Sequence, residues 1–206
     1  MNKRTGLLWL LLSMPLFLHS CGSAVDGKSG PQLVRYDFTG QVDFLTGDPG
    51  FPVALDDAVT GTFSIDPLVK DINPNPQQGM YPQTAPTGVE VYFASTVFRA
   101  DPASFPPYRI AVLNDVAGPQ IQPADTLQWS AGDPSLASLL KVGNVQATMF
   151  LQDETAAVFA NDALPARIDL HDFSQAWISL NAVNFRVNGA DCLWGIHVRL
   201  DSIKQR

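Results

Sequence analysis

Strict alternation of apolar and polar residues is the strongest constraint on how this chain folds. From Val34 to Phe44, apolar or small residues occupy every second position and polar residues fill the positions between them. A period of two puts one set of side chains on each face of an extended strand. The segment 59–65 repeats the pattern. The chain therefore predicts half-buried β-strands with one face in a core.

Several further segments are short and rich in β-branched or aromatic residues, which brings the expected number of strands to about ten. They lie at 89–93, 96–99, 108–113, 126–130, 145–151, 177–181, 184–187 and 193–200. Asp-Pro pairs, which favour turns, separate several of them. Helical spacing is confined to 134–142, behind Asp133 as a cap. We expect an all-β fold, an antiparallel β-sandwich that is jelly-roll-like.

The segment 66–88 is expected to be a long loop. It holds five prolines, Pro67, Pro74, Pro76, Pro82 and Pro86. Proline cannot donate to a sheet ladder, so this segment cannot be a central strand. Long loops in a compact domain are usually functional or disordered, which makes it the first place to look for a site.

The chain begins with the outline of a secretory leader. Lys3 and Arg4 precede an uncharged, leucine-rich run that ends at Ser20. The run is shorter than the roughly 20 residues of a membrane-spanning helix, and Pro15 interrupts it. We expect a removable signal peptide at 1–20, a flexible tether at 21–32 and one domain at 33–206.

Leu18-His19-Ser20-Cys21-Gly22 resembles the lipobox of bacterial lipoproteins. The resemblance implies that Cys21 carries the lipid, that the leader is cut before it, and that the acyl chains hold the protein at the membrane of a bacterial cell envelope. His19 departs from the usual pattern at its position. The alternative is ordinary cleavage after Ala24, which discards Cys21 and releases a soluble protein.

Charge and cysteine content narrow the possible partners. The net charge is −7, and the leader holds basic residues but no acidic ones, so the processed chain is more acidic still. Such a chain is a poor partner for nucleic acid or anionic lipid. The remaining cysteine, Cys192, is expected to be a small buried apolar residue.

Few residues suit catalysis or metal binding. After the leader the chain keeps only two histidines, His171 and His197, and their spacing does not suit a zinc site. A Ser-His-Asp arrangement stays open because triads assemble in space. Calcium is the one cofactor considered, since oxygen ligands gather near the long loop. Those ligands are Asp56, Asp57, Asp66, Asp71, Asn73 and Asn75.

Aromatic residues offer the one sequence signal for a ligand site. Tyr81, Trp129 and Trp177 are the candidates, because exposed aromatic rings stack on sugars. Aromatic residues in alternating strands are more often part of the core. Tyr81 is of particular interest because it lies in the proline-rich segment.

Several short motifs resemble a group of secreted bacterial β proteins, many of which carry a PEP-CTERM sorting tail and have no established activity. The matching pieces are Tyr36-Asp37-Phe38-Thr39-Gly40, the segment 59–66, Gly79-Met80-Tyr81, Asn114-Asp115 and the segment 161–165. The resemblance implies export and a β-sandwich, and it assigns no functional residue. The lipid at Cys21 is expected to replace the sorting tail as the anchor.

These features lead to a ranked expectation for function. The first is a non-catalytic binding or structural module of the cell envelope, whose partners are the membrane, through its lipid, and an envelope protein or carbohydrate. The second is an extracellular carbohydrate- or ligand-binding domain. The third is a secreted hydrolase.

Overall fold

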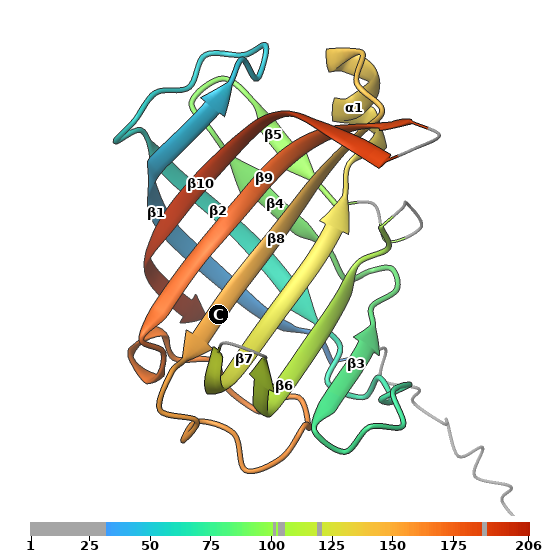
Figure 1. The fold of residues 1–206 in the computed structure, drawn as a ribbon, viewed down its shortest axis with the longest axis vertical. Coiled ribbons are helices and arrows are strands. Elements are labelled where there is room, and N and C mark those ends of the chain that lie inside the picture. Colours follow the sequence, from blue (N-terminus) through green and yellow to red (C-terminus); the bar gives the residue numbers. More distant parts are fainter. Residues whose placement is uncertain (1–31, 101, 103–105, 119–120, 187–188) are drawn as a thin grey trace, which may run out of the picture. The chain divides into compact units, whose positions relative to one another are not determined.

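The described chain forms one antiparallel sheet of ten strands (Figure 1). In this computed structural model the described residues are 32–100, 102, 106–118, 121–186 and 189–206. The leader, Cys21 and the tether up to residue 31 lie outside them. The strands are β1 (Val34–Gly47), β2 (Ala58–Ile65), β3 (Gln78–Pro82), β4 (Val89–Tyr92), β5 (Val97–Arg99), β6 (Arg109–Gly118), β7 (Ile121–Gly132), β8 (Asn144–Asp153), β9 (Gln175–Arg186) and β10 (Gly189–Gln205).

The strand order is β3-β6-β7-β8-β9-β10-β1-β2-β4-β5. The sheet curls strongly, so that β6 to β9 lie in front of β2, β4 and β5 in Figure 1. The expected all-β, antiparallel fold is confirmed. The two-sheet sandwich with jelly-roll topology is not confirmed, because the hydrogen bonds join all ten strands into a single sheet.

Two short helical segments interrupt the strands. The helix α1 (Pro134–Leu140) begins where the helical spacing predicted it, and the Asp133 side chain accepts a hydrogen bond from the Leu136 N–H at 2.9 Å. A 3-10 turn, η1 (Leu170–Asp172), follows Asp169, which caps it in the same way. No helix among the described residues is long and apolar enough to cross a membrane.

Aromatic rings join the two halves of the curled sheet. Tyr36 of β1 stacks on Phe63 of β2 with a centroid distance of 4.8 Å. Phe63 in turn contacts Trp129 of β7, whose ring meets the edge of Tyr108 just before β6. In the sheet, β8, β9, β10 and β1 separate β7 from β2. The Phe63–Trp129 contact is therefore possible only because the sheet curls back on itself.

Polar contacts also tie the ends of the curl together. The Tyr108 hydroxyl, fully buried, donates to the Ser64 carbonyl at 3.0 Å, and burial raises the pKa of Tyr108 far above its ordinary value. Gln83 bridges the same region: its N–H donates to the Tyr108 carbonyl, and its side-chain oxygen accepts from the Asp66 N–H at 2.8 Å.

On each edge strand of the sheet, an aspartate side chain accepts a hydrogen bond from one backbone N–H. At the β3 edge, Asp71 Oδ1 accepts from the Met80 N–H at 2.7 Å, and the Ile72 N–H donates to the Met80 carbonyl. At the β5 edge, Asp133 Oδ2 accepts from the Arg99 N–H at 2.7 Å. An edge whose backbone groups are occupied is a weaker template for pairing with another chain.

Two expectations for strand residues are wrong, for identifiable reasons. Phe44 is 58% exposed although the alternation places it inside, because a bulge between Val42 and Phe44 reverses the phase of β1. Cys192 is exposed rather than buried. The segment 66–88 is not a loop throughout, because Gln78–Pro82 forms β3; β3 is an edge strand, where proline is tolerated, which agrees with the exclusion of a central strand.

The packing around Gly61 leaves no room for a side chain at this position. It faces Phe38 across the β1–β2 ladder, and a Cβ at Gly61 would lie 2.1 Å from Phe38 Cζ and 2.4 Å from the Glu90 carbonyl oxygen. Since Phe38 is fully buried, its ring has no free space to move into.

We predict that Gly61→Ala lowers the free energy of unfolding by about 1–3 kcal/mol, the usual cost of overpacking a core. Gly88→Ala is the matched control, because a Cβ there meets no atom within 4 Å. Urea denaturation followed by circular dichroism measures both. Equal stability of the two variants would contradict this packing.

Candidate functional site

The outer face of the sheet carries a row of aromatic side chains across three neighbouring strands. Phe150 of β8 and Trp177 of β9 are stacked with a centroid distance of 5.2 Å, and Trp177 also stacks on His197 of β10 at 5.9 Å. The His197 ring is hydrogen-bonded to Asp43 of β1. We call Phe150, Trp177, His197 and Asp43 the outer strip.

The outer strip arises from strand register and phase. Phe150 and Trp177 are paired directly across the β8–β9 ladder, and Trp177 is paired with Arg199 of β10. Side chains that face each other across a ladder stand on the same face of the sheet. The neighbours of Phe150 in sequence, Met149 and Leu151, are fully buried, so Phe150 itself points outward.

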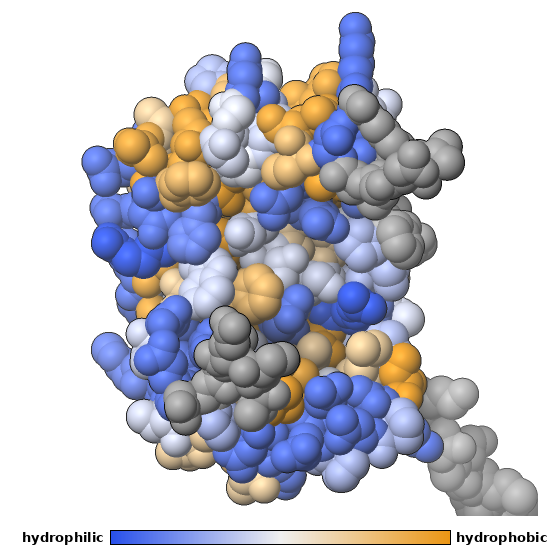
Figure 2. Space-filling model, viewed as in Figure 1, coloured by the Kyte–Doolittle hydropathy of each residue, from blue (hydrophilic) through white to orange (hydrophobic). Residues whose placement is uncertain are grey.

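Polar groups surround the rings. His197 Nδ1 donates to Asp43 Oδ1 at 2.5 Å, because an ionised carboxylate can only accept. Arg199 donates to Gln41 Oε1 at 3.2 Å on the adjacent strands. Figure 2 shows the side of the sheet on which the strip lies. This surface is largely hydrophilic, and its hydrophobic side chains gather mainly towards the end that carries α1.

The ring geometry limits what the strip can bind. Trp177 is nearly parallel to both neighbours, with interplanar angles of 23° and 27°. Since β8 and β10 flank β9 on opposite sides, Phe150 and His197 cover the two faces of the indole. The half-buried Trp177 thus presents mainly its ring edge to solvent. Such an edge contributes apolar contact and leaves hydrogen bonding to the polar neighbours.

The structure separates the three aromatic candidates. Trp177 lies in the outer strip. Trp129 is only 1% exposed and belongs to the core, so its ring offers no face to a ligand. Tyr81 is also buried, with its hydroxyl donating to the Asp162 carbonyl at 2.8 Å; burial raises the pKa of Tyr81, and the charges of Asp71 and Asp162 raise it further. The expectation of a stacking surface is therefore wrong for Tyr81 and Trp129.

The oxygen ligands considered for calcium serve local turns. Asp66 and Asp71 each accept from the N–H two residues on, as do Asn73 and Asn75. Asp57 Oδ2 accepts from the Ala54 N–H at 2.7 Å. Among the described residues, no group of three or more His, Cys, Asp or Glu side chains is placed to hold a metal ion.

The histidines do not form a triad in the described chain. His197 has a carboxylate partner, and Ser179 lies next to it across the β9–β10 ladder, yet no hydrogen bond joins the two. β9, β10 and β1 are central strands, so the sheet ladder uses most of the backbone N–H groups that an oxyanion hole needs. His171 is exposed in η1, where its N–H donates to Asp169.

Two members of the outer strip were missed from sequence. Phe150 lies between two other apolar residues, Met149 and Leu151, so the alternation does not single it out. Its even-numbered position nevertheless differs from the buried positions of Val145 and Ala147, and this predicts that its ring points outward. Asp43 meets His197 only through the bulge in β1 and the pairing with β10, and no local pattern announces that contact.

Comparison of the chain with models of known protein families, with curated proteins and with solved structures gives no match.

Proposed function

We propose that the protein is an exported lipoprotein of the bacterial cell envelope whose single β domain acts by binding. The position of Cys21 carries this proposal. It follows the leader directly and precedes the compact unit Pro31–Arg206, which holds every strand. A lipid on Cys21 leaves the whole sheet free, and two or three acyl chains make attachment effectively permanent.

The surface supports binding rather than catalysis as the mode of action. The outer strip joins half-buried rings to a hydrogen-bonded polar pair, His197 and Asp43, on a continuous sheet face. That combination suits recognition of a partly apolar, partly polar surface, such as another envelope protein.

The anchor is tested by Cys21→Ser. We expect the unchanged protein to enter the detergent phase on Triton X-114 partitioning, and the variant to remain in the aqueous phase, because loss of the acyl chains removes the membrane affinity. Cys192→Ser is the matched control, since Cys192 lies in the folded domain and is expected to leave partitioning unchanged. Detergent partitioning of the Cys21 variant would contradict the lipid anchor.

Carbohydrate binding is the second candidate, and the outward position of Trp177 beside Gln41 and Arg199 favours it. Aromatic edges and polar planar side chains can hold a sugar from the side even where ring faces are covered. We predict that binding on a glycan array through this surface is lost in Trp177→Ala and kept in Tyr92→Ala, which removes an exposed aromatic of β4, away from the outer strip. Absence of glycan binding, or equal binding by both variants, would contradict this candidate.

A further inference from the structure

Four basic side chains gather on one part of the outer surface, although the chain as a whole is acidic. Arg35, Arg99 and Arg206 line a hollow of about 300 Å³ on the outer face of β1, β2, β4 and β5. Lys204 is paired with Asp37 across the β10–β1 ladder, so it stands on the same face. We call Arg35, Arg99, Lys204 and Arg206 the basic patch.

Carboxylates neutralise only half of the basic patch. Arg206 Nε lies 2.6 Å from Asp37 Oδ2, and Arg99 Nε lies 3.0 Å from Glu90 Oε1. Within the part of the chain that the structure describes, Arg35 and Lys204 form no ion pair, and both are exposed. The patch therefore keeps two uncompensated positive charges next to two fixed ion pairs.

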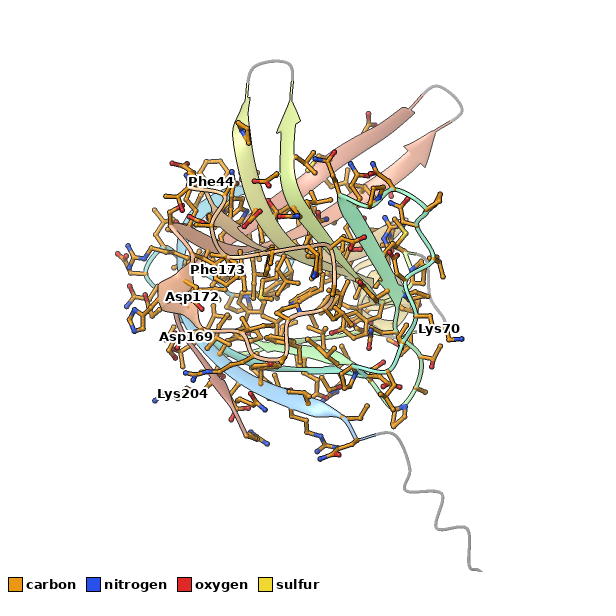
Figure 3. All side chains as sticks on the ribbon, turned by 90° about the horizontal axis from the view of Figure 1, so that it is seen from below. Phe44, Lys70, Asp169, Asp172, Phe173 and Lys204 are labelled. Atoms are coloured by element: carbon orange, nitrogen blue, oxygen red, sulfur yellow. The ribbon has the colours of Figure 1, made fainter. Side chains whose placement is uncertain are left out.

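A second hollow adjoins the basic patch through Arg206. It measures about 280 Å³ and is lined by Gln32, Leu33, Val34, Pro67, Leu68, Gln205 and Arg206. Leu68 is 77% exposed, an unusual position for a leucine in a domain with a large core. Gln32 is the first described residue, so this is where the segment from Cys21 enters the domain. Figure 3 shows Lys204 projecting outward from the C-terminal part of β10.

We propose that the basic patch and Leu68 dock on the anionic phospholipid surface of the membrane that holds the lipid anchor. This proposal rests on the lipid at Cys21, because only segment 22–32 separates that cysteine from the strands, and a chain of that length cannot reach beyond about 40 Å even when fully extended. Attraction to anionic lipid acts within about 8 Å at physiological salt. The end of the domain where the tether enters is thus the end whose charge matches the lipid surface.

Because salt screens charges beyond about 8 Å, the charge of the surface that touches the membrane matters more for docking than the net charge of the whole domain. The net negative charge, which grows when the basic leader is removed, predicts poor binding to anionic lipid when the domain tumbles freely. Near the surface, each basic side chain contributes roughly a fivefold gain in binding. Docking through the patch turns this end to the membrane, and Leu68 adds apolar contact at the headgroup boundary.

The test uses the processed chain 21–206 with Cys21→Ser, which has no lipid of its own. The compact unit begins at Pro31 and holds all the strands of the described residues, so we expect this chain to keep the fold. Binding to vesicles of equal parts phosphatidylglycerol and phosphatidylcholine is measured by co-sedimentation at low salt, beside vesicles of phosphatidylcholine alone. We expect binding to the anionic vesicles only.

The double variant Arg35→Gln and Lys204→Gln is expected to weaken that binding about 25-fold, from the loss of two basic residues at the surface. The control Arg109→Gln and Lys141→Gln removes the same charge elsewhere and is expected to change binding by less than about twofold. Equal loss in both double variants, or equal binding to both vesicle types, would overturn the proposal. Since the probe carries no lipid, such a failure leaves the Cys21 anchor untouched, and partitioning of Cys21→Ser tests the anchor alone.

Discussion

The contact between the Phe63 and Trp129 rings is the interaction on which the rest of the structure depends. It joins β2 to β7 across the core, while the hydrogen-bonded path between these strands runs through four others. Tyr36 and Tyr108 extend the contact on both sides. Large rings bury much apolar area and prefer tilted or edge contacts, which suits the meeting of two twisted halves of one sheet. The contact lies within a large buried cluster to which strands from both halves of the sheet contribute.

Closure of the curl decides which surfaces remain for binding. The edges of β3 and β5 are occupied by the carboxylates of Asp71 and Asp133, so strand addition is disfavoured there. What remains is the outer face, which carries the outer strip on β8, β9, β10 and β1. The basic patch lies on the same face: it shares β10 and β1 with the strip, but further along these strands, and extends to β5. A domain that docks through the patch leaves the rings of the strip on β8 and β9 free for a second partner.

The sequence predicted local structure better than long-range arrangement. Alternation located most strands, and the Asp133 cap located α1, because both depend on neighbours in the chain. The bulge that turns Phe44 outward and the pairing that joins Asp43 to His197 depend on β10, far away in sequence. Composition likewise could not separate Trp177 from Trp129, since the same residue type faces solvent on β9 and the core on β7. The net charge likewise did not reveal the basic patch, because it does not report which charged residues the fold brings together.

The central claim is that one sheet curls until β2 and β7 meet through their aromatic side chains. Nuclear Overhauser effects between ring protons of Phe63 and Trp129, in protein with labelled aromatic residues, test it most directly. The account predicts strong cross-peaks for this pair, together with those between Phe38 and Gly61 on the adjacent strands β1 and β2. Cross-peaks for the Phe38–Gly61 pair without any between Phe63 and Trp129 would show that β1 and β2 pair but that β2 and β7 do not meet across the core. That result would contradict the account.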